Sequence, residues 1–438
     1  MVKVTFMGAG STVFAKNVLG DCIMTPAIMD LHIYLYDIDP VRLKDSQKML
    51  ENIAANSGRT DVTIVATLDR IEALTGAQYV VNAIQVGGYK PCTVTDFEIP
   101  KKYKLRQTIA DTLGIGGIFR TLRTIPVMDS FAKDMEKVCP DALFINYTNP
   151  MAMLSGYMQR YTNIRTVGLC HSVQACVPGL LHTFKMDEYK DSCRWEIAGI
   201  NHQAWLLKLT DLQGNDLYPE IKRRNLDEGA GYEKDWDLVR LDMMKRFGYY
   251  ITESSEHTSE YTPWYIKDRY PELIDRYKIP LDEYPRRCVN QIEGWEKMRE
   301  DLVHNTKLEH TKSHEFAAYI IEAMESDKPY RIHGNVLNRG LITNLPRNAC
   351  VEVPCMVDRN GINPCLVGDL PEQCAAINRT NINVQLLTIQ AAVSHKKEDV
   401  YMAAMLDPHT GAELSQDDIC SMCDDLFEAH KDWLPEYK

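Results

Sequence analysis

Short apolar runs alternate with helical patterns along the first 175 residues of the chain. The runs are typical of buried strands, and the stretches between them carry apolar residues at helical spacing. The clearest helical patterns cover residues 40–57 and 117–138. Such alternation indicates an α/β fold with a Rossmann-like, doubly wound parallel sheet. The predicted strands cover residues 3–7, 31–36, 62–66, 79–84, 142–146 and 165–169.

The pattern changes after Trp195, where charged helical stretches are mixed with short strands and loops. These helices are predicted at residues 232–245, 285–304 and 313–326. We therefore expect two domains. Residues 1–194 would form the Rossmann-like dinucleotide-binding domain, and residues 195–438 a second, α+β domain for substrate binding and oligomerisation.

A glycine-rich turn follows the first predicted strand and precedes a helical pattern at residues 12–25. Glycine at positions 8 and 10 allows a tight turn and a close approach of backbone to a pyrophosphate, and the helix amides supply donors. Val13 occupies the place of the third glycine in the usual fingerprint. From the turn alone, an ordinary strand-to-helix connection stays open as the alternative.

The second predicted strand strengthens the dinucleotide interpretation, because it runs directly into Asp37. A carboxylate there can bind the ribose diol, and it favours NAD over NADP because it would repel a 2′-phosphate. The predicted cofactor-binding residues are Gly8, Gly10, Ser11, Thr12 and Asp37.

Composition and charge narrow the class of protein. The 438 residues carry 49 basic and 61 acidic side chains, a net charge of −12, which argues against nucleic acid or an anionic membrane as the main partner. The sequence shows neither a leader pattern nor an apolar stretch of membrane-spanning length. The 13 cysteines form no compact framework, so we expect reduced thiols in a cytoplasmic protein.

Two strand-like runs end in residues that can bind a metal, Cys170 and His202. We expect Asn149 and Asp111, which lie in loops of the Rossmann-like part, near the same edge of the sheet. A thiolate and an imidazole suit a borderline divalent cation and leave positions that a sugar diol could fill. Taken singly, Cys170 could be a buried small side chain and His202 a hydrogen-bonded core histidine. Their matched placement at strand ends favours the metal site.

Several distinctive motifs are spread along the whole chain. They include Asn-Tyr-Thr-Asn-Pro-Met-Ala-Met at 146–153, Gly-Leu-Cys-His-Ser-Val-Gln at 168–174 and Gly-Ile-Asn-His at 199–202. In these segments the chain resembles the family 4 glycoside hydrolases, and within that family it most resembles bacterial members that act on α-galactosides such as melibiose. Further matching segments are residues 8–12, 84–89, 107–112, 253–257, 407–410 and 432–435.

The resemblance implies a hydrolysis that departs from the two-carboxylate scheme of most glycosidases. NAD⁺ oxidises the sugar, a divalent metal, usually manganese, assists elimination of the aglycone, water adds, and the sugar is reduced again. The cofactor is therefore regenerated in every turnover. It also implies a homodimer or a homotetramer.

The resemblance assigns roles to individual residues. Cys170 and His202 match the metal ligands. Tyr261 matches the base that removes a proton from the sugar, and Asp111 the carboxylate that assists it. Tyr265 is close enough in the sequence to be the alternative base.

Three further residues are assigned to the sugar and its leaving group. Asn149 matches a ligand of sugar hydroxyls. Arg287 is a second candidate, although the adjacent Arg286 could serve as well. His171 is the candidate acid for the leaving oxygen, because imidazole titrates near neutrality. Its alternative role is to orient the metal ligands.

The loop after the fourth predicted strand bears on the substrate. Family members that act on 6-phosphorylated sugars carry an arginine there, which can hold the phosphate in a bidentate contact. Residues 87–96 contain Lys90 but no arginine, so we expect an unphosphorylated sugar, although a lysine can also hold phosphate. Three alternatives stay open: an α-galacturonidase of the same family, a simple NAD-dependent sugar dehydrogenase that releases NADH, and an NAD-sensing binding protein.

Overall fold

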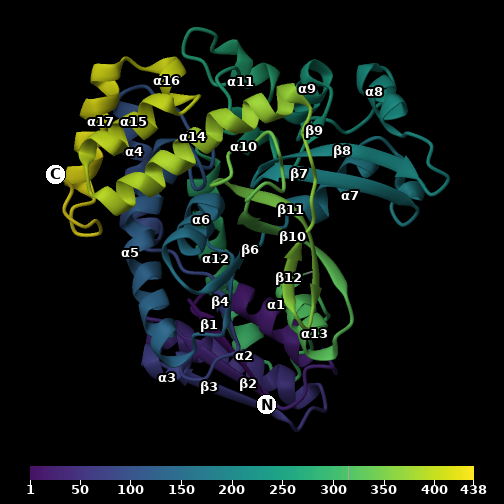
Figure 1. Ribbon diagram of the computed structural model, residues 1–438, viewed down its shortest axis with the longest axis vertical. Coiled ribbons are helices and arrows are strands. Elements are labelled where there is room, and N and C mark those ends of the chain that lie inside the picture. The colour runs from purple at the N-terminus through teal and green to yellow at the C-terminus, as the bar shows by residue number, and fades with distance from the viewer. Residues whose placement is uncertain (314) are drawn as a thin grey trace.

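A 12-stranded mixed sheet runs through the protein (Figure 1). The computed structural model describes residues 1–313 and 315–438. The strand order is β3-β2-β1-β4-β5-β6-β10-β11-β7-β8-β9, and β12 pairs with β11. The first six strands in this order are parallel, which is the order of a Rossmann fold. The predicted doubly wound parallel sheet is therefore confirmed.

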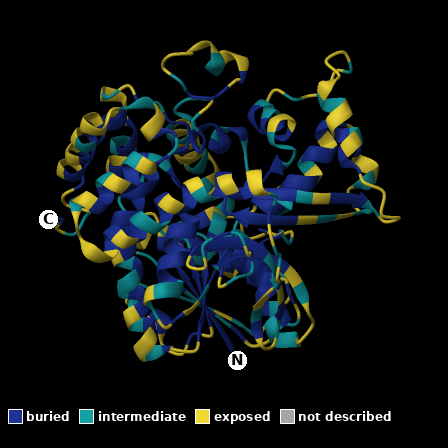
Figure 2. Cartoon of the chain, turned by 45° about the horizontal axis from the view of Figure 1, so that its top comes forward, coloured by how far each residue is buried: buried dark blue, intermediate teal, exposed yellow. Residues whose placement is uncertain are grey.

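The parallel strands lie within two residues of their predicted ends, because strands covered on both faces are continuous apolar runs. Their bounds are β1 Val2–Met7, β2 Leu31–Tyr36, β3 Val62–Thr67, β4 Tyr79–Asn82, β5 Leu143–Asn146 and β6 Arg165–Gly168. In Figure 2 these strands are mostly dark blue, whereas the outer faces of the helices carry the exposed positions.

The helices between these strands confirm the βα alternation. The predicted helices 40–57 and 117–138 are α2 and α5, and α5 begins three residues earlier than predicted, at Gly114. The elements are α1 Thr12–Ile23, α2 Pro40–Asn56, α3 Arg70–Leu74, the π-helical turn η1 Gly88–Thr93, α4 Val94–Lys102, α5 Gly114–Val138, α6 Met151–Tyr161, α7 Ser172–Thr183 and the 3-10 turn η2 Asp187–Tyr189.

The second half of the chain continues the same sheet with antiparallel strands. β10 pairs with β6 where Asn335 lies opposite Gly168, so the two halves share one hydrogen-bonded sheet. The division at residue 194 stays a prediction. The strands are β7 Cys193–Ile200, β8 Gln203–Asp211, β9 Tyr250–Ile251, β10 Tyr330–Leu337, β11 Cys350–Asp358 and β12 Gly361–Pro364.

The second half mixes these antiparallel strands with helices, which gives the α+β character that the sequence predicts. The helix predicted over 232–245 begins only at Leu238, and the one predicted over 313–326 begins at Phe316, with residue 314 outside the described residues. The helices are α8 Tyr218–Leu226, α9 Leu238–Phe247, α10 Ser255–Glu260, α11 Glu272–Arg276, α12 Glu283–Val303, α13 Phe316–Ser326, α14 Glu372–Ser394, α15 Lys397–Leu406, α16 Thr410–Glu413 and α17 Gln416–Ala429.

The hairpin between β7 and β8 differs from what the sequence pattern suggests. His202 does not follow a strand of the parallel sheet. It lies with Asn201 in a two-residue turn between antiparallel strands. The backbone φ of His202 is +61°, as a tight hairpin turn requires.

Helix α14 holds this hairpin in place as it crosses above the sheet in Figure 1. Asn378 donates to the Gln203 carbonyl at 2.8 Å and accepts from the indole of Trp205 at 3.2 Å. Asn381 donates to the carbonyl of Tyr261 at 3.2 Å. One helix therefore positions both the β7–β8 turn and the residue that follows α10. Within the described residues, no helix is long and apolar enough to cross a membrane.

Candidate active site

The glycine turn and Asp37 form one hydrogen-bonded unit at the carboxyl ends of β1 and β2. The amide of Gly10 donates to Oδ2 of Asp37 at 2.6 Å. A Cβ atom at Gly10 would lie 2.8 Å from the same oxygen, and one at Gly8, whose φ is +87°, would lie 2.6 Å from the carbonyl of Ala83. Only glycine fits both positions, so the turn exposes backbone where a pyrophosphate would approach.

The start of α1 has the polar groups expected of a phosphate site. Ser11 precedes the helix, and its hydroxyl makes no capping hydrogen bond. Thr12 is buried and donates to the carbonyl of Gly10 at 3.1 Å. Because amides at a helix N-terminus attract anions, the five predicted cofactor residues fit a dinucleotide.

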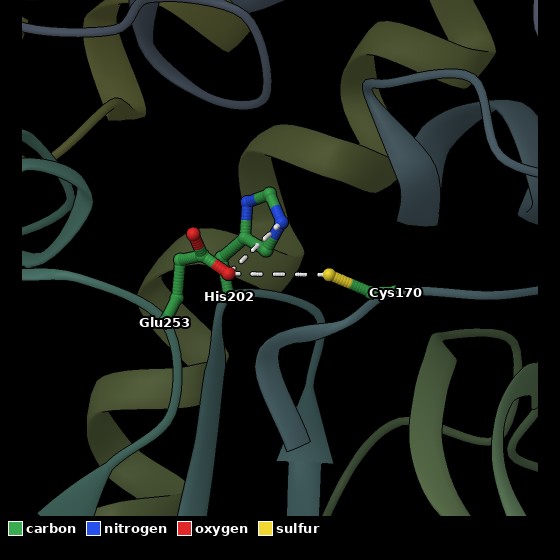
Figure 3. Close-up of side chains that lie close together, drawn as sticks. All are labelled: Cys170, His202 and Glu253. Carbon is green, nitrogen blue, oxygen red and sulfur yellow. Dashed lines mark hydrogen bonds and ion pairs between the residues drawn. The ribbon is translucent and has the colours of Figure 1, made fainter. Parts of the chain in front are cut away.

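Cys170 and His202 come together although they follow different strands, β6 and β7 (Figure 3). Cys170 follows β6 at the start of α7, where the amide of Ser172 donates to its sulfur at 3.5 Å. Figure 3 shows one carboxylate oxygen of Glu253 facing both the Cys170 sulfur and the His202 ring. Oε2 of Glu253 lies 4.0 Å from Sγ of Cys170 and 3.8 Å from Nε2 of His202.

The electrostatics of this cluster suit a divalent cation. Burial, and then the carboxylates of Glu253 and Glu352, raise the pKa of the Cys170 thiol, so a thiolate there needs a positive charge beside it. The donor set of sulfur, imidazole nitrogen and carboxylate oxygen fits a borderline ion. Cys170 and His202 therefore fit the metal role that the sequence suggests.

Tyr261 lies against the far side of the His202 ring. Its hydroxyl is 3.1 Å from Nδ1 of His202, and its side chain is buried. Burial, and then Asp111 and Glu260, raise the pKa of Tyr261. The alternative base, Tyr265, instead donates to Asp242 at 2.9 Å. The structure thus brings Tyr261, and not Tyr265, to the candidate metal ligands.

Asp111 and Asn149 also meet, as the sequence predicts for loops at one sheet edge. Nδ2 of Asn149 donates to Oδ2 of Asp111 at 3.2 Å, and Nε2 of His257 lies 3.7 Å from Oδ1 of the same carboxylate. Burial opposes ionisation of Asp111, but His257 and Arg120 outweigh it and lower its pKa. Asp111 is therefore a carboxylate near neutral pH.

His171 is held in place by a buried acid. Its Nε2 lies 2.7 Å from Oε1 of Glu315, while 55% of its own side chain stays exposed. The hydrogen bond to Glu315 raises the pKa of His171 above its ordinary value. Tyr147 packs against the ring, with centroids 6.2 Å apart. This geometry suits a proton donor that faces a bound molecule.

Arg287 is not brought into contact with the other candidates. It bonds Glu256 at 3.0 Å and Glu283 at 2.8 Å, and 44% of its side chain is exposed. Arg286 also bonds Glu283 and is exposed. The buried arginine of the site is Arg120, which donates to the carbonyl of Asn149 at 3.2 Å.

Sequence reasoning missed the acidic and basic residues that surround the predicted ones. Glu253, His257 and Tyr261 are spaced by four residues in the sequence, although only His257 lies within α10, since Glu253 precedes the helix and Tyr261 follows it. That spacing is a signal that could have revealed them. Arg120 and Glu260 give no such signal, because each lies in a helix that carries other charged residues, such as Arg123 and Glu256.

Glu260 holds the loop that carries Asp111. Its carboxylate accepts from the amides of Thr108 at 3.0 Å, Ile109 at 3.3 Å and Ala110 at 2.9 Å. Burial raises the pKa of Glu260 to about 7, although His257 and the amides favour the ionised form. The residue before the candidate base therefore fixes the loop that carries the assisting carboxylate.

Sequence comparison identifies the family. The family 4 glycosyl hydrolase model matches residues 3–186, and the family 4 glycosyl hydrolase C-terminal domain model matches residues 197–410. The chain is 63% identical over 438 residues to an α-galactosidase of Bacillus subtilis, with 100% of both chains covered. It is 26% identical over 449 residues to an α-galacturonidase of Thermoanaerobacter italicus, covering 99% of this chain and 97% of the relative.

The fold agrees with these relationships. A solved structure of a 6-phospho-α-glucosidase from gut microorganisms, in complex with NAD and Mn²⁺, superposes with a TM-score of 0.80 at 20% identity, and 100% of both chains is covered. The resemblance seen in the sequence motifs is confirmed. The chain belongs to the family 4 glycosyl hydrolases.

Proposed function

We propose that the protein is an α-galactosidase that hydrolyses unphosphorylated α-galactosides such as melibiose, and that it uses NAD and a divalent cation such as Mn²⁺. The 63% identity to the B. subtilis α-galactosidase supports this substrate, against 26% to the α-galacturonidase. Family membership supports NAD dependence. The absence of arginine from residues 87–96 supports an unphosphorylated sugar.

The observation that carries the proposal is the contact between Tyr261 and His202. A histidine that binds a metal through Nε2 keeps its proton on Nδ1. Nδ1 of His202 would then donate to the Tyr261 oxygen, 3.1 Å away. A hydrogen bond donated to the phenolate oxygen would stabilise the charged form and oppose the rise that burial causes in the pKa of Tyr261. One side chain would thus link the metal to the base.

The other residues take roles that their positions support. Cys170 and His202 would hold the cation, and the glycine turn with Ser11, Thr12 and Asp37 would hold NAD. When bound, NAD⁺ supplies reversible hydride transfer at a sugar carbon, and the cation supplies a Lewis acid.

Side chains of the protein accept and donate the protons of the reaction. Tyr261 accepts a proton from a carbon of the sugar ring, next to the carboxylate of Asp111. His171 donates a proton to the oxygen of the leaving group and is held for this by Glu315. Asn149 binds a sugar hydroxyl, and Arg287 stays a weaker candidate because it is exposed and paired with acids.

The test is hydrolysis of a chromogenic α-galactoside by dialysed protein. NAD⁺, Mn²⁺ and a thiol reductant are added back singly and together. We expect activity only with all three, and no net formation of NADH. Steady NADH release would instead indicate a sugar dehydrogenase, and cleavage restricted to α-galacturonides would indicate the other family activity. Binding of NAD without hydrolysis of an α-galactoside or an α-galacturonide would favour an NAD-sensing binding protein.

We also propose a homodimer or a homotetramer, as the family resemblance implies, with contacts in residues 195–438. Light scattering coupled to gel filtration measures the mass directly. A particle of 50.1 kDa, the mass of one chain, would contradict this proposal.

A further inference from the structure

We propose that Glu253 is a third protein ligand of the metal, besides Cys170 and His202. This inference rests on the proposed function, since it requires that a cation binds there. Neither distance from its Oε2, 3.8 Å to Nε2 of His202 and 4.0 Å to Sγ of Cys170, is that of a strong hydrogen bond. The oxygen is held close to two metal-binding atoms without a short bond to either.

The distances between the three donor atoms fit ligands of a single metal ion. Protein donors lie about 2.0–2.3 Å from a divalent metal, so two ligands of the same ion are at most about 4.6 Å apart. The atoms of Cys170, His202 and Glu253 all lie within 4.8 Å of one another, and the two measured distances from Glu253 are shorter than this limit. A carboxylate oxygen also suits Mn²⁺ better than a site of sulfur and nitrogen alone.

The backbone at Glu253 has a strained conformation, which sets the direction of its side chain. Its φ is +71°, a left-handed conformation that costs a residue with a Cβ atom free energy and that glycine adopts readily. Strain of this kind persists where the surroundings fix it, and it is common at functional sites.

A buried ion pair supplies the restraint. Arg240 donates to the carbonyl of Glu253 and pairs with Asp237 at 2.5 Å. The hydroxyl of Ser255, two residues after Glu253, donates to the carboxylate of Asp237 at 3.4 Å. Arg240 and Asp237 are both buried. The backbone on either side of the strained residue is therefore tied to one rigid group.

The first test measures Mn²⁺ affinity by the electron paramagnetic resonance signal of free Mn²⁺, with metal-stripped protein and saturating NAD⁺. Loss of groups that only orient metal ligands lowers affinity about 10- to 100-fold, so we expect Glu253→Gln to raise the Kd by about 100-fold or more. Glu196→Gln removes one carboxylate from the exposed side of β7 and serves as the matched control, with unchanged Kd.

A second variant separates a ligand from a structural residue. Glu253→Gly removes the carboxylate at a position where glycine is favoured, so we expect a Tm no lower than that of the wild type together with the same loss of Mn²⁺ affinity. If Glu253 only stabilised the fold, its removal would lower Tm and leave the Kd unchanged.

The outcomes distinguish this inference from the proposed function. Wild-type protein that binds no Mn²⁺ would refute the metal site as a whole. Wild type that binds Mn²⁺, with both Glu253 variants within about threefold of its Kd, would refute only the role of Glu253. A variant with unchanged Kd but a raised KM would assign Glu253 to the sugar instead.

Discussion

Replacing Glu260 with glutamine tests whether the hydrogen bonds between Glu260 and the amides of residues 108–110 position Asp111. The three amides that face the carboxylate are all donors, from Thr108, Ile109 and Ala110. The carbonyl of a glutamine could accept from two of them, but its amide group would point a donor at the third. A buried donor left without a partner costs about 1–3 kcal/mol. Moving the loop relieves that conflict, so we expect the loop to shift.

The expected effect on stability is small and the effect on activity large. The entropy of unfolding is about 2.1 cal/mol/K per residue, or about 0.9 kcal/mol/K for 438 residues. A loss of about 1–3 kcal/mol therefore lowers Tm by only about 1–3 °C. A displacement of a catalytic group by about 1 Å can reduce the rate about 100-fold, and Asp111 directly follows the clamped amides.

The assay combines kcat for a chromogenic α-galactoside with Tm and the affinities for NAD⁺ and Mn²⁺. The control is Asp399→Asn, which alters a buried carboxylate on α15 that accepts from Gln390 at 2.9 Å and Ser394 at 2.5 Å. We expect a similar Tm change in both variants and a fall in kcat only in Glu260→Gln. Equal kcat values in the two variants would refute the reasoning.

Three more predictions follow from individual contacts. Tyr261→Phe should lower kcat by about 100- to 10,000-fold, the range of acid–base catalysis, whereas Tyr265→Phe, which loses only its bond to Asp242, should retain activity; equal losses would exclude Tyr261 as the base. Asn149→Ala should raise KM about 10-fold and leave the Kd for NAD⁺ unchanged, as isothermal titration can check; parallel losses would contradict its role in sugar binding. Peroxide should inactivate the enzyme and a thiol reductant restore it if Cys170 is a thiolate ligand, and full activity after peroxide treatment would argue against that role.

The sequence was most informative where the fold is most regular. The parallel strands could be located because each is an apolar run between helical patterns, and Cys170 and Asn149 could be placed because they follow such strands. The antiparallel extension was harder to predict. β10 buries His333 and Asn335 among its apolar residues. These polar residues interrupt the apolar run by which a buried strand is predicted.

The same contrast holds within the site. His202 was found because it follows a strand-like run, but its place in a hairpin turn was not, because pairing between strands is not visible in local periodicity. Glu253 and Glu260 depend on contacts that span long stretches of the chain. Glu260 reaches amides about 150 residues earlier, and no local pattern encodes such a partner.

Residues 253–261, which contain α10, connect the proposed metal ligands, the proposed base and Asp111. Glu253 faces Cys170 and His202, and His257 lies between Glu253 and Asp111, 3.7 Å from each carboxylate. Glu260 fixes the loop of Asp111, and Tyr261 touches His202. These groups are close in the sequence, because all four lie within residues 253–261.

Asn381 on α14 anchors this segment through the carbonyl of Tyr261 at 3.2 Å and also bonds the side chain of Gln203, next to His202, at 3.0 Å. The relative positions of the proposed metal ligands, the proposed base and its assisting carboxylate therefore depend on how α14 packs on the β7–β8 hairpin. Because α14 belongs to the C-terminal half and Cys170 to the parallel sheet, the site is complete only when both halves of the chain are folded together.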